Sequence, residues 1–295
     1  MRSFWILCSV LLWCCIGSAK AVTVTDAEGT FTMDHTPTRI VALELSFVDD
    51  LAAIGVKPVG VADDNAPERV LPEVRRIAGQ WESVGLRSQP SLERIAALKP
   101  DLIIADVSRH SGVAAQLKAI APTLMLASRR ATYAENLHAA ALIGEVVGQS
   151  SAMTERLTEH RQRMADFARQ LPAGKQMQFL VARPDTLFIH APDSFVAGVL
   201  TSLGLSVPTL TRSDELASRQ ISLEQLLAIN PQALLIGSYD QGKVLNAWQN
   251  KPLWQVLNAV REKQVYSVDA NIWVRCLGIL AAEHMGRDLV RLLGQ

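Results

Sequence analysis

The chain has 295 residues, and its 29 basic side chains balance 29 acidic ones. This balance argues against a general nucleic-acid or membrane-surface binder, because such proteins carry a basic excess. Most of the basic side chains are arginines, which recognise carboxylate and phosphate oxygens in a bidentate manner. A GC-rich genome explains the same bias, so only the placement of individual arginines carries an argument.

The first residues are typical of a cleavable export signal. Arg2 precedes an apolar run from Phe4 to Ile16, and Ala19-Lys20-Ala21 follows as a small-residue cleavage signature. An apolar run of about 13 residues is shorter than the roughly 20 that a membrane-spanning helix needs. We therefore predict a signal peptide at 1–21, a mature chain that starts at Val22 in the periplasm, and no membrane insertion.

Two segments that lie 131 positions apart repeat one pattern. The residues from Ser91 to Ile104 share Ser, Leu, Glu, Ala and Pro, in register, with those from Ser222 to Leu235. Each copy predicts a short amphipathic helix that ends before a proline and leads into a buried strand, which is the unit of a parallel α/β sheet. Together with the length of the chain, the repeat predicts two similar lobes.

Apolar runs of strand length occur in both halves of the chain. The candidates are Arg39–Leu43, Val56–Val61, Leu102–Asp106, Thr123–Ala127, Gln178–Ala182, Leu187–His190, Ala233–Gly237 and Val265–Val268. The region between the two groups is predicted to be helical, with a break near Gly148 and a cap at Ser150 or Ser151. We therefore expect α/β lobes with mainly parallel sheets at 22–132 and 172–295, joined by long helices at 133–171.

Common enzyme signatures are absent from the sequence. It contains no GxSxG, GxxxxGK[ST], GxGxxG or HExxH motif. The histidines are scattered without the spacing of metal ligands, so we predict no catalytic residue, no metal ligand and no cofactor. Cys276 is the one cysteine beyond the predicted signal. Its apolar neighbours favour a packing role, and the alternative is a secreted hydrolase or redox protein that uses this thiol.

Arginines follow several of the predicted strands, where open α/β sheets hold their ligands. They are Arg87, Arg109 and Arg129 in the first half and Arg183 and Arg275 in the second. Convergent arginines suit a polyanionic cargo, because charge-assisted hydrogen bonds to carboxylates are stronger than neutral ones. For each arginine, a solvated charge or a structural ion pair is the alternative. Trp273 is expected either in the core or as a wall of the ligand cleft.

The motif Gly85–Glu93 followed by Leu98–Ile103 resembles the helical-backbone class of periplasmic binding proteins for siderophores, haem and cobalamin. Within this class the chain is most similar to ferric-citrate-binding members, through residues 43–47, 62–65, 108–110, 132–137 and 252–255. The resemblance implies two Rossmann-like lobes, a cargo held in the cleft between them, and delivery to an inner-membrane ABC permease.

The resemblance also implies roles for individual residues. Arg87 is expected to contact anionic oxygens of the cargo, and Trp273 to form an aromatic wall of the cleft. Glu93 and Glu224, one in each copy of the repeat, are expected to dock onto arginines of the permease. The alternative for each glutamate is a first-turn position that the helix dipole favours.

We therefore expect a monomeric periplasmic protein, not an enzyme, that captures ferric citrate. Iron stays coordinated by citrate, so the protein supplies no metal ligand. The alternative cargo is another anionic siderophore or a metal–tricarboxylate complex. The predicted ligand-binding residues are Arg87, Ser108, Arg109, Arg129, Arg183, Trp273 and Arg275.

Overall fold

The computed structural model describes residues 21–183, 185–208, 218–239 and 243–294. The predicted signal peptide therefore lies, except for Ala21, outside the described residues. Within the described part of the chain, no helix is both long and apolar enough to cross a membrane.

The first lobe is built on a five-stranded sheet in which all pairs are parallel, in the order β5-β4-β3-β8-β9. The strands are β3 (Ile40–Ala42), β4 (Gly60–Val61), β5 (Glu82–Ser83), β8 (Leu102–Asp106) and β9 (Thr123–Leu126). Every residue of β8 is buried, as expected for a parallel strand that helices cover on both faces. These helices are α1 (Leu45–Ala53), α2 (Pro72–Ala78), α3 (Leu92–Ala97), α4 (Val107–His110) and α5 (Ala114–Ile120).

Two short antiparallel pairs in this lobe were not predicted. The strands β1 (Val22–Asp26) and β2 (Gly29–Met33) form a hairpin whose Asp26 accepts a hydrogen bond from the Met125 backbone N–H at 2.9 Å. The strands β6 (Gly85–Leu86) and β7 (Gln89–Pro90) form a second, tighter hairpin.

The second lobe contains a mixed five-stranded sheet in the order β12-β11-β10-β13-β14. Its strands are β10 (Met177–Ala182), β11 (Leu187–His190), β12 (Ser218–Ile221), β13 (Ala233–Ser238) and β14 (Val265–Asp269). The pairs β10–β13 and β13–β14 are parallel, whereas β10–β11 and β11–β12 are antiparallel. The helices are α8 (Phe195–Ser202), α9 (Leu223–Ile229), α10 (Lys243–Gln249), α11 (Pro252–Gln255), α12 (Asn258–Arg261) and α13 (Ala270–Arg275).

The predicted two-lobed α/β fold is confirmed, and the repeat corresponds to one unit in each lobe. Ser91 caps α3 and Ser222 caps α9, and each helix leads into a buried strand of its sheet. Lys99 and Asn230, the residues before the two prolines, both have positive φ, at 47° and 42°. The mainly parallel arrangement holds for the first sheet. The second sheet is half antiparallel, because β11 runs antiparallel to both β10 and the unpredicted strand β12.

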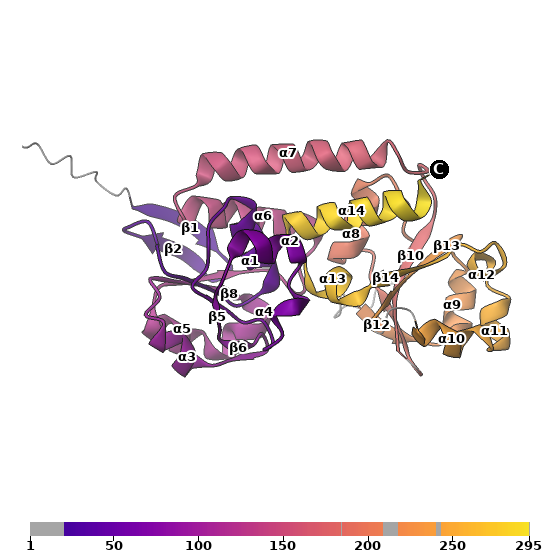
Figure 1. Cartoon of the computed structure of the whole chain (residues 1–295), viewed down its shortest axis with the longest axis horizontal. Helices are drawn as coiled ribbons and strands as arrows, with labels where there is room; N and C mark the ends of the chain where they lie inside the picture. Colours follow the sequence, from indigo (N-terminus) through magenta and orange to yellow (C-terminus); the bar gives the residue numbers. More distant parts are fainter. Residues whose placement is uncertain (1–20, 184, 209–217, 240–242, 295) are drawn as a thin grey trace, which may run out of the picture.

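The predicted long helical region consists of α6 (Tyr133–Val146) and α7 (Ser150–Ala168), separated at Gly148. Figure 1 shows α7 running above both lobes. The predicted serine cap of α7 is wrong, because Gln149 is the N-cap residue and no side chain caps this end.

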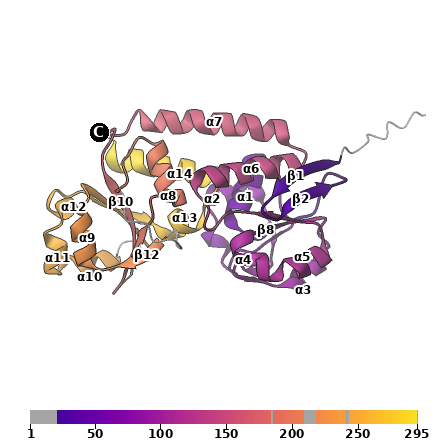
Figure 2. The ribbon, with the colours of Figure 1, turned by 180° about the vertical axis from the view of Figure 1, so that it is seen from behind.

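The last helix, α14 (Ile279–Leu293), also connects the lobes and lies beneath α7 in both views (Figures 1 and 2). Leu280 and Ala281 belong to the hydrophobic core of the first lobe, whereas Met285 and Leu289 belong to that of the second. Asp49 of α1 accepts hydrogen bonds from the backbone N–H groups of Leu280 at 2.7 Å and Ala281 at 2.9 Å. A carboxylate of the first lobe thus satisfies N–H groups at the start of α14.

Candidate functional site

A cavity of about 250 Å³ lies between the two lobes, and arginine dominates its lining. The first lobe contributes Arg87, Arg109, Arg129 and Arg130, and the second contributes His190, Ser194, Phe195, Val196, Ser218, Tyr239, Val274, Arg275 and Leu277. Four arginines therefore face Arg275 across the cleft. Of the five, Arg130 was not predicted, although it directly follows Arg129.

Asp106, at the end of β8, fixes two of the loops that carry these arginines. Its carboxylate caps α4 by accepting from the Arg109 backbone N–H at 2.9 Å. It also accepts from the backbone N–H groups of Ser128 at 2.9 Å and Arg129 at 3.2 Å, in the loop after β9. One buried carboxylate thus positions two neighbouring loops at the carboxyl edge of the parallel sheet.

Arg87 is the most enclosed of the cleft arginines, with 6% of its surface exposed. Its Nη2 and Nε donate to Asp64 Oδ2 at 2.8 and 3.2 Å, and its backbone N–H donates to Asp64 Oδ1 at 3.0 Å. Its carbonyl accepts from His110 Nε2 at 2.7 Å. Burial opposes the charge of Arg87, but the hydrogen bond to Asp64 and the charges of Glu44 and Asp64 outweigh it and raise its pKa.

Glu44 lies behind Arg87 and Arg109 and has 2% of its surface exposed. Its Oε2 is 3.4 Å from Arg87 Nη1, and its Oε1 forms an ion pair with Arg109 Nε. Burial raises the pKa of Glu44 to about 7, even though both arginines act to lower it. Glu44 and Asp64 were missed in the sequence, because an acid behind an arginine has no motif of its own.

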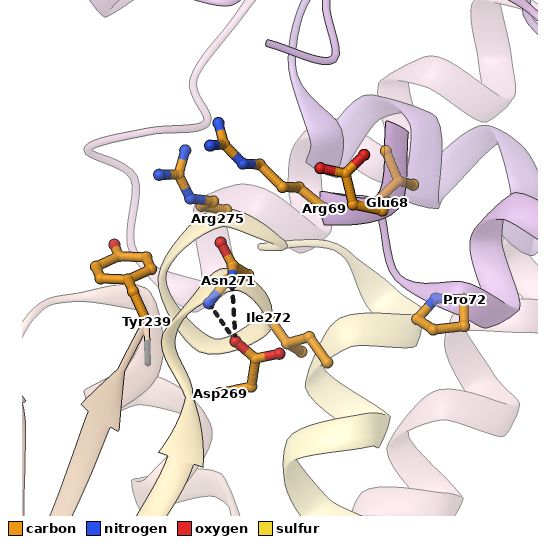
Figure 3. Close-up of a pocket in the computed structure, with 9 residues that line it drawn as sticks. Glu68, Arg69, Pro72, Tyr239, Asp269, Asn271, Ile272 and Arg275 are labelled. Carbon is orange, nitrogen blue, oxygen red and sulfur yellow. Dashed lines mark hydrogen bonds between the residues drawn. The ribbon is translucent and has the colours of Figure 1, made fainter. Parts of the chain in front are cut away.

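Arg275 joins the two lobes through Asp64. Its Nη1 donates to Asp64 Oδ2 at 3.1 Å, and its guanidinium lies 5.4 Å from the centre of the Tyr239 ring. A second hollow of about 380 Å³ is also lined by Arg275. Figure 3 shows Arg69 and Arg275 side by side at this hollow. The two hollows share Tyr239 and Arg275, so these side chains divide the interlobe space.

Arg129 and Arg130 differ from the other cleft arginines, because both are exposed. Neither side chain forms an ion pair or a hydrogen bond with another described residue. The positive charge of Arg129 acts to lower the pKa of Arg109. Within the described part of the chain, these two guanidiniums therefore have no contact that binding of an anion would have to break.

The expectation that Trp273 walls the cleft is corrected by its placement. Trp273 is fully buried in the core of the second lobe, where it stacks on Phe179 with 5.7 Å between ring centres. Its indole N–H donates to Asp288 of α14 at 3.0 Å. Aromatic side chains of the cavity lining come instead from His190, Phe195 and Tyr239, which directly follows β13.

Two other predicted ligand residues lie outside the cavity lining. The Ser108 hydroxyl donates to Asp106 at 2.5 Å and so helps to hold the α4 loop. Arg183 is exposed at the end of β10, and its guanidinium lies 5.3 Å from the centre of the Phe188 ring. The structure thus brings Arg87, Arg109, Arg129 and Arg275 together, but not Ser108 or Arg183.

The thiol and metal alternatives find no support at this site. Cys276 is buried, and burial raises the pKa of its thiol to about 12, so it is protonated at neutral pH and a poor nucleophile. Its Sγ lies 3.5 Å from the Arg69 carbonyl oxygen. Among the described residues, no group of three or more His, Cys, Asp or Glu side chains is arranged to hold a metal ion.

Residues 40–272 match the family model described as periplasmic binding protein. The chain belongs to this family, whose members are binding proteins rather than enzymes. It is 52% identical, over 94% of its length and 92% of the relative, to the Fe(3+) dicitrate-binding periplasmic protein FecB of Escherichia coli K12. It is 37% identical, over 91% of its length and 84% of the relative, to the Fe(3+)-citrate-binding protein YfmC of Bacillus subtilis.

Solved structures support the fold. The petrobactin-binding protein YclQ of Bacillus subtilis superposes with a TM-score of 0.79, at 20% identity, over 94% of this chain and 99% of that one. SirA of Staphylococcus aureus in complex with staphyloferrin B gives a TM-score of 0.78, at 22% identity, over 92% and 98%. At these identities the likeness shows a shared two-lobed fold.

Proposed function

We propose that this protein is a monomeric periplasmic carrier that captures ferric citrate in the interlobe cavity and delivers it to an inner-membrane ABC permease. The observation that carries the proposal is the convergence of five arginines from both lobes on one cavity, in a chain 52% identical to a ferric-dicitrate-binding protein. Arginine binds carboxylates bidentately, and citrate presents several of them.

The arginines divide the work of binding. Arg129 and Arg130 are exposed and are the first to meet an anion at the cleft. Arg87 and Arg109 lie deeper and are partly neutralised by Glu44 and Asp64. Because the cavity lining holds guanidiniums rather than a cluster of metal ligands, iron stays bound to citrate and no resident metal or cofactor is needed.

Calorimetric titration with ferric citrate, iron-free citrate and a ferric hydroxamate tests this cargo. We expect ferric citrate to bind, and Arg129→Ala with Arg130→Ala to lower its affinity by about 100-fold, because two charge-assisted contacts are lost. Arg183→Ala is the matched control, since Arg183 is an exposed arginine outside the cavity, and it should bind as the wild type does. Preference for the hydroxamate, or no binding of any ligand, would refute ferric citrate as the cargo.

Glu93 and Glu224 are proposed as the permease-docking residues. Each is exposed in the first turn of its helix, and α3 and α9 lie in different lobes, both below α7 in Figure 1. Glu93→Ala with Glu224→Ala should leave ferric citrate affinity unchanged and lower uptake into cells several-fold. Glu155→Ala, on the exposed side of α7, is the control and should import normally. Normal uptake by the double variant would exclude this docking role.

A further inference from the structure

Glu44 is a buried carboxyl that does not itself line the cavity. It precedes α1 as the N-cap residue, but its side chain caps no backbone N–H. It turns instead toward the backs of Arg87 and Arg109, whose guanidiniums line the cavity. Its Oε1 accepts no hydrogen bond from any described residue, so this oxygen is held by charge alone.

The charged groups around Glu44 act on its pKa in opposite directions. Arg109 of α4 and Arg87 after β6 favour its ionised form, while Asp106 at the end of β8 and Asp64 after β4 oppose it. Burial adds the largest opposition and places the pKa of Glu44 at about 7. His110, which contacts Arg87 and Asp106, stays neutral because burial lowers its pKa. A small change in local charge therefore decides whether Glu44 carries a proton.

Binding of an anion makes that change. A carboxylate that docks on the cavity side of Arg87 and Arg109 competes with Glu44 for the same two guanidiniums and repels its negative charge. We infer that Glu44 takes up a proton when anionic cargo binds, so that capture of the anion and protonation of Glu44 are linked. This inference rests on the proposed function, because it concerns the same cargo and the same arginines.

The sign of the linkage follows from the two protonation states. Between the pKa of Glu44 in the empty protein and its higher value in the complex, the empty protein is ionised and the complex is protonated. Affinity in this range falls as the pH rises, by up to about tenfold per pH unit. At pH values below the lower pKa, Glu44 is protonated in both states, and its contribution to the pH dependence vanishes.

Calorimetry of ferric citrate binding at about pH 8, in buffers of different ionisation enthalpy, counts the protons taken up. We expect wild-type protein to take up close to one proton more than Glu44→Gln, a neutral side chain of the same shape. Glu44→Gln should also bind ferric citrate more tightly than the wild type at this pH, by up to about tenfold. Glu155→Gln is the matched control, because Glu155 is an exposed carboxyl on α7 outside the cavity lining, and this variant should take up as many protons as the wild type.

A purely structural role gives a different result. If Glu44 only holds Arg87 and Arg109 in place, Glu44→Gln binds more weakly and takes up as many protons as the wild type, which overturns the inference. Infrared difference spectra of the wild type give a second readout that does not depend on folding of the variant. A new protonated-carboxyl band should appear on binding, and its absence would equally overturn the inference. Failure of both wild type and variant to bind ferric citrate would instead refute the proposed cargo.

Discussion

The two lobes hold their cavity arginines in different ways. On the first lobe, Arg87 and Arg109 are anchored by Glu44 and Asp64, and their side chains are only 7% and 16% exposed. On the second lobe, Arg275 is 24% exposed and meets Asp64 across the cleft. The first face is therefore a preorganised anion site, whereas the second depends on the first for its electrostatic partner.

Among the described residues of the cavity lining, Arg275 is the one Lys, Arg, Asp or Glu that the second lobe contributes. His190 is neutral because burial lowers its pKa to about 4, and Ser194, Ser218 and Tyr239 add hydroxyl groups. This difference indicates that the first lobe selects the charge of the cargo, while the second covers the cargo with weaker polar contacts.

Replacing one arginine on each face tests this comparison most strongly. Arg87→Ala should lower ferric citrate affinity by about 100-fold or more, because it removes a ligand contact and takes one arginine partner each from Glu44 and Asp64. Arg275→Ala should lower ferric citrate affinity by about tenfold, since it loses one partly exposed contact. Calorimetric titration measures both values. Equal losses would show that the two faces contribute alike and would break the comparison.

Trp273→Phe tests whether Trp273 contributes to the stability of the second lobe rather than to ligand binding. We expect the free energy of unfolding to fall by about 1–3 kcal/mol, because the hydrogen bond to Asp288 is lost and the smaller ring leaves a void beside Phe179. Urea unfolding measures this change. Ferric citrate affinity of the folded variant should stay within about twofold of wild type. A large loss of affinity at unchanged stability would return Trp273 to the binding site.

Two buried carboxyls of the first lobe, Glu44 and Asp49, should make the stability of the protein depend on pH. Burial raises the pKa of Glu44 and Asp49 to about 7, above their unfolded values of 4.5 and 3.8. A raised carboxyl pKa stabilises the fold at low pH, and this contribution is lost as the pH rises through about 7. The empty protein should therefore gain on the order of 1 kcal/mol between about pH 8 and pH 6.5.

Thermal unfolding at a series of pH values checks this prediction. Glu44→Gln should flatten the dependence and leave the part that belongs to Asp49. Below about pH 6.5, burial of neutral His190 opposes the trend, because the unfolded chain then binds protons that the folded protein does not. A free energy of unfolding that rises steadily from pH 6.5 to pH 8 would contradict the environments described for Glu44 and Asp49.

The sequence was most informative where local pattern and fold coincide. The repeated Ser-Leu-Glu and Pro segments predicted a helix and a buried strand in each lobe, because caps, prolines and apolar runs act over a few residues. Arg87, Arg109, Arg129 and Arg275 were predicted at the cleft because they follow predicted strands, where open α/β sheets hold their ligands, and all four line the cavity. The second sheet is half antiparallel because β11 runs antiparallel to both β10 and β12, and the pairing of β11 with β12 joins distant segments without a local signal.

The missed site residues share a physical cause. Residues two positions apart on a helix point in different directions, so the sequence of α13 alone could not show that Trp273 faces the core while Arg275 faces the cleft. Glu44 and Asp64 act from behind their arginines, at separations of 43 and 23 residues from Arg87. Only the folded chain brings these charges together.

The course of α14 has a consequence for how the chain reaches its folded state. Ile279, Leu280 and Ala281 cover Asp49 and Asp50 of the first lobe and donate their backbone N–H groups to these buried acids. The first lobe is thus finished by residues close to the C-terminal end of the described chain. A nascent chain that carries all of the first sheet still lacks part of its core, so native packing of that lobe has to wait until α14 has been synthesised.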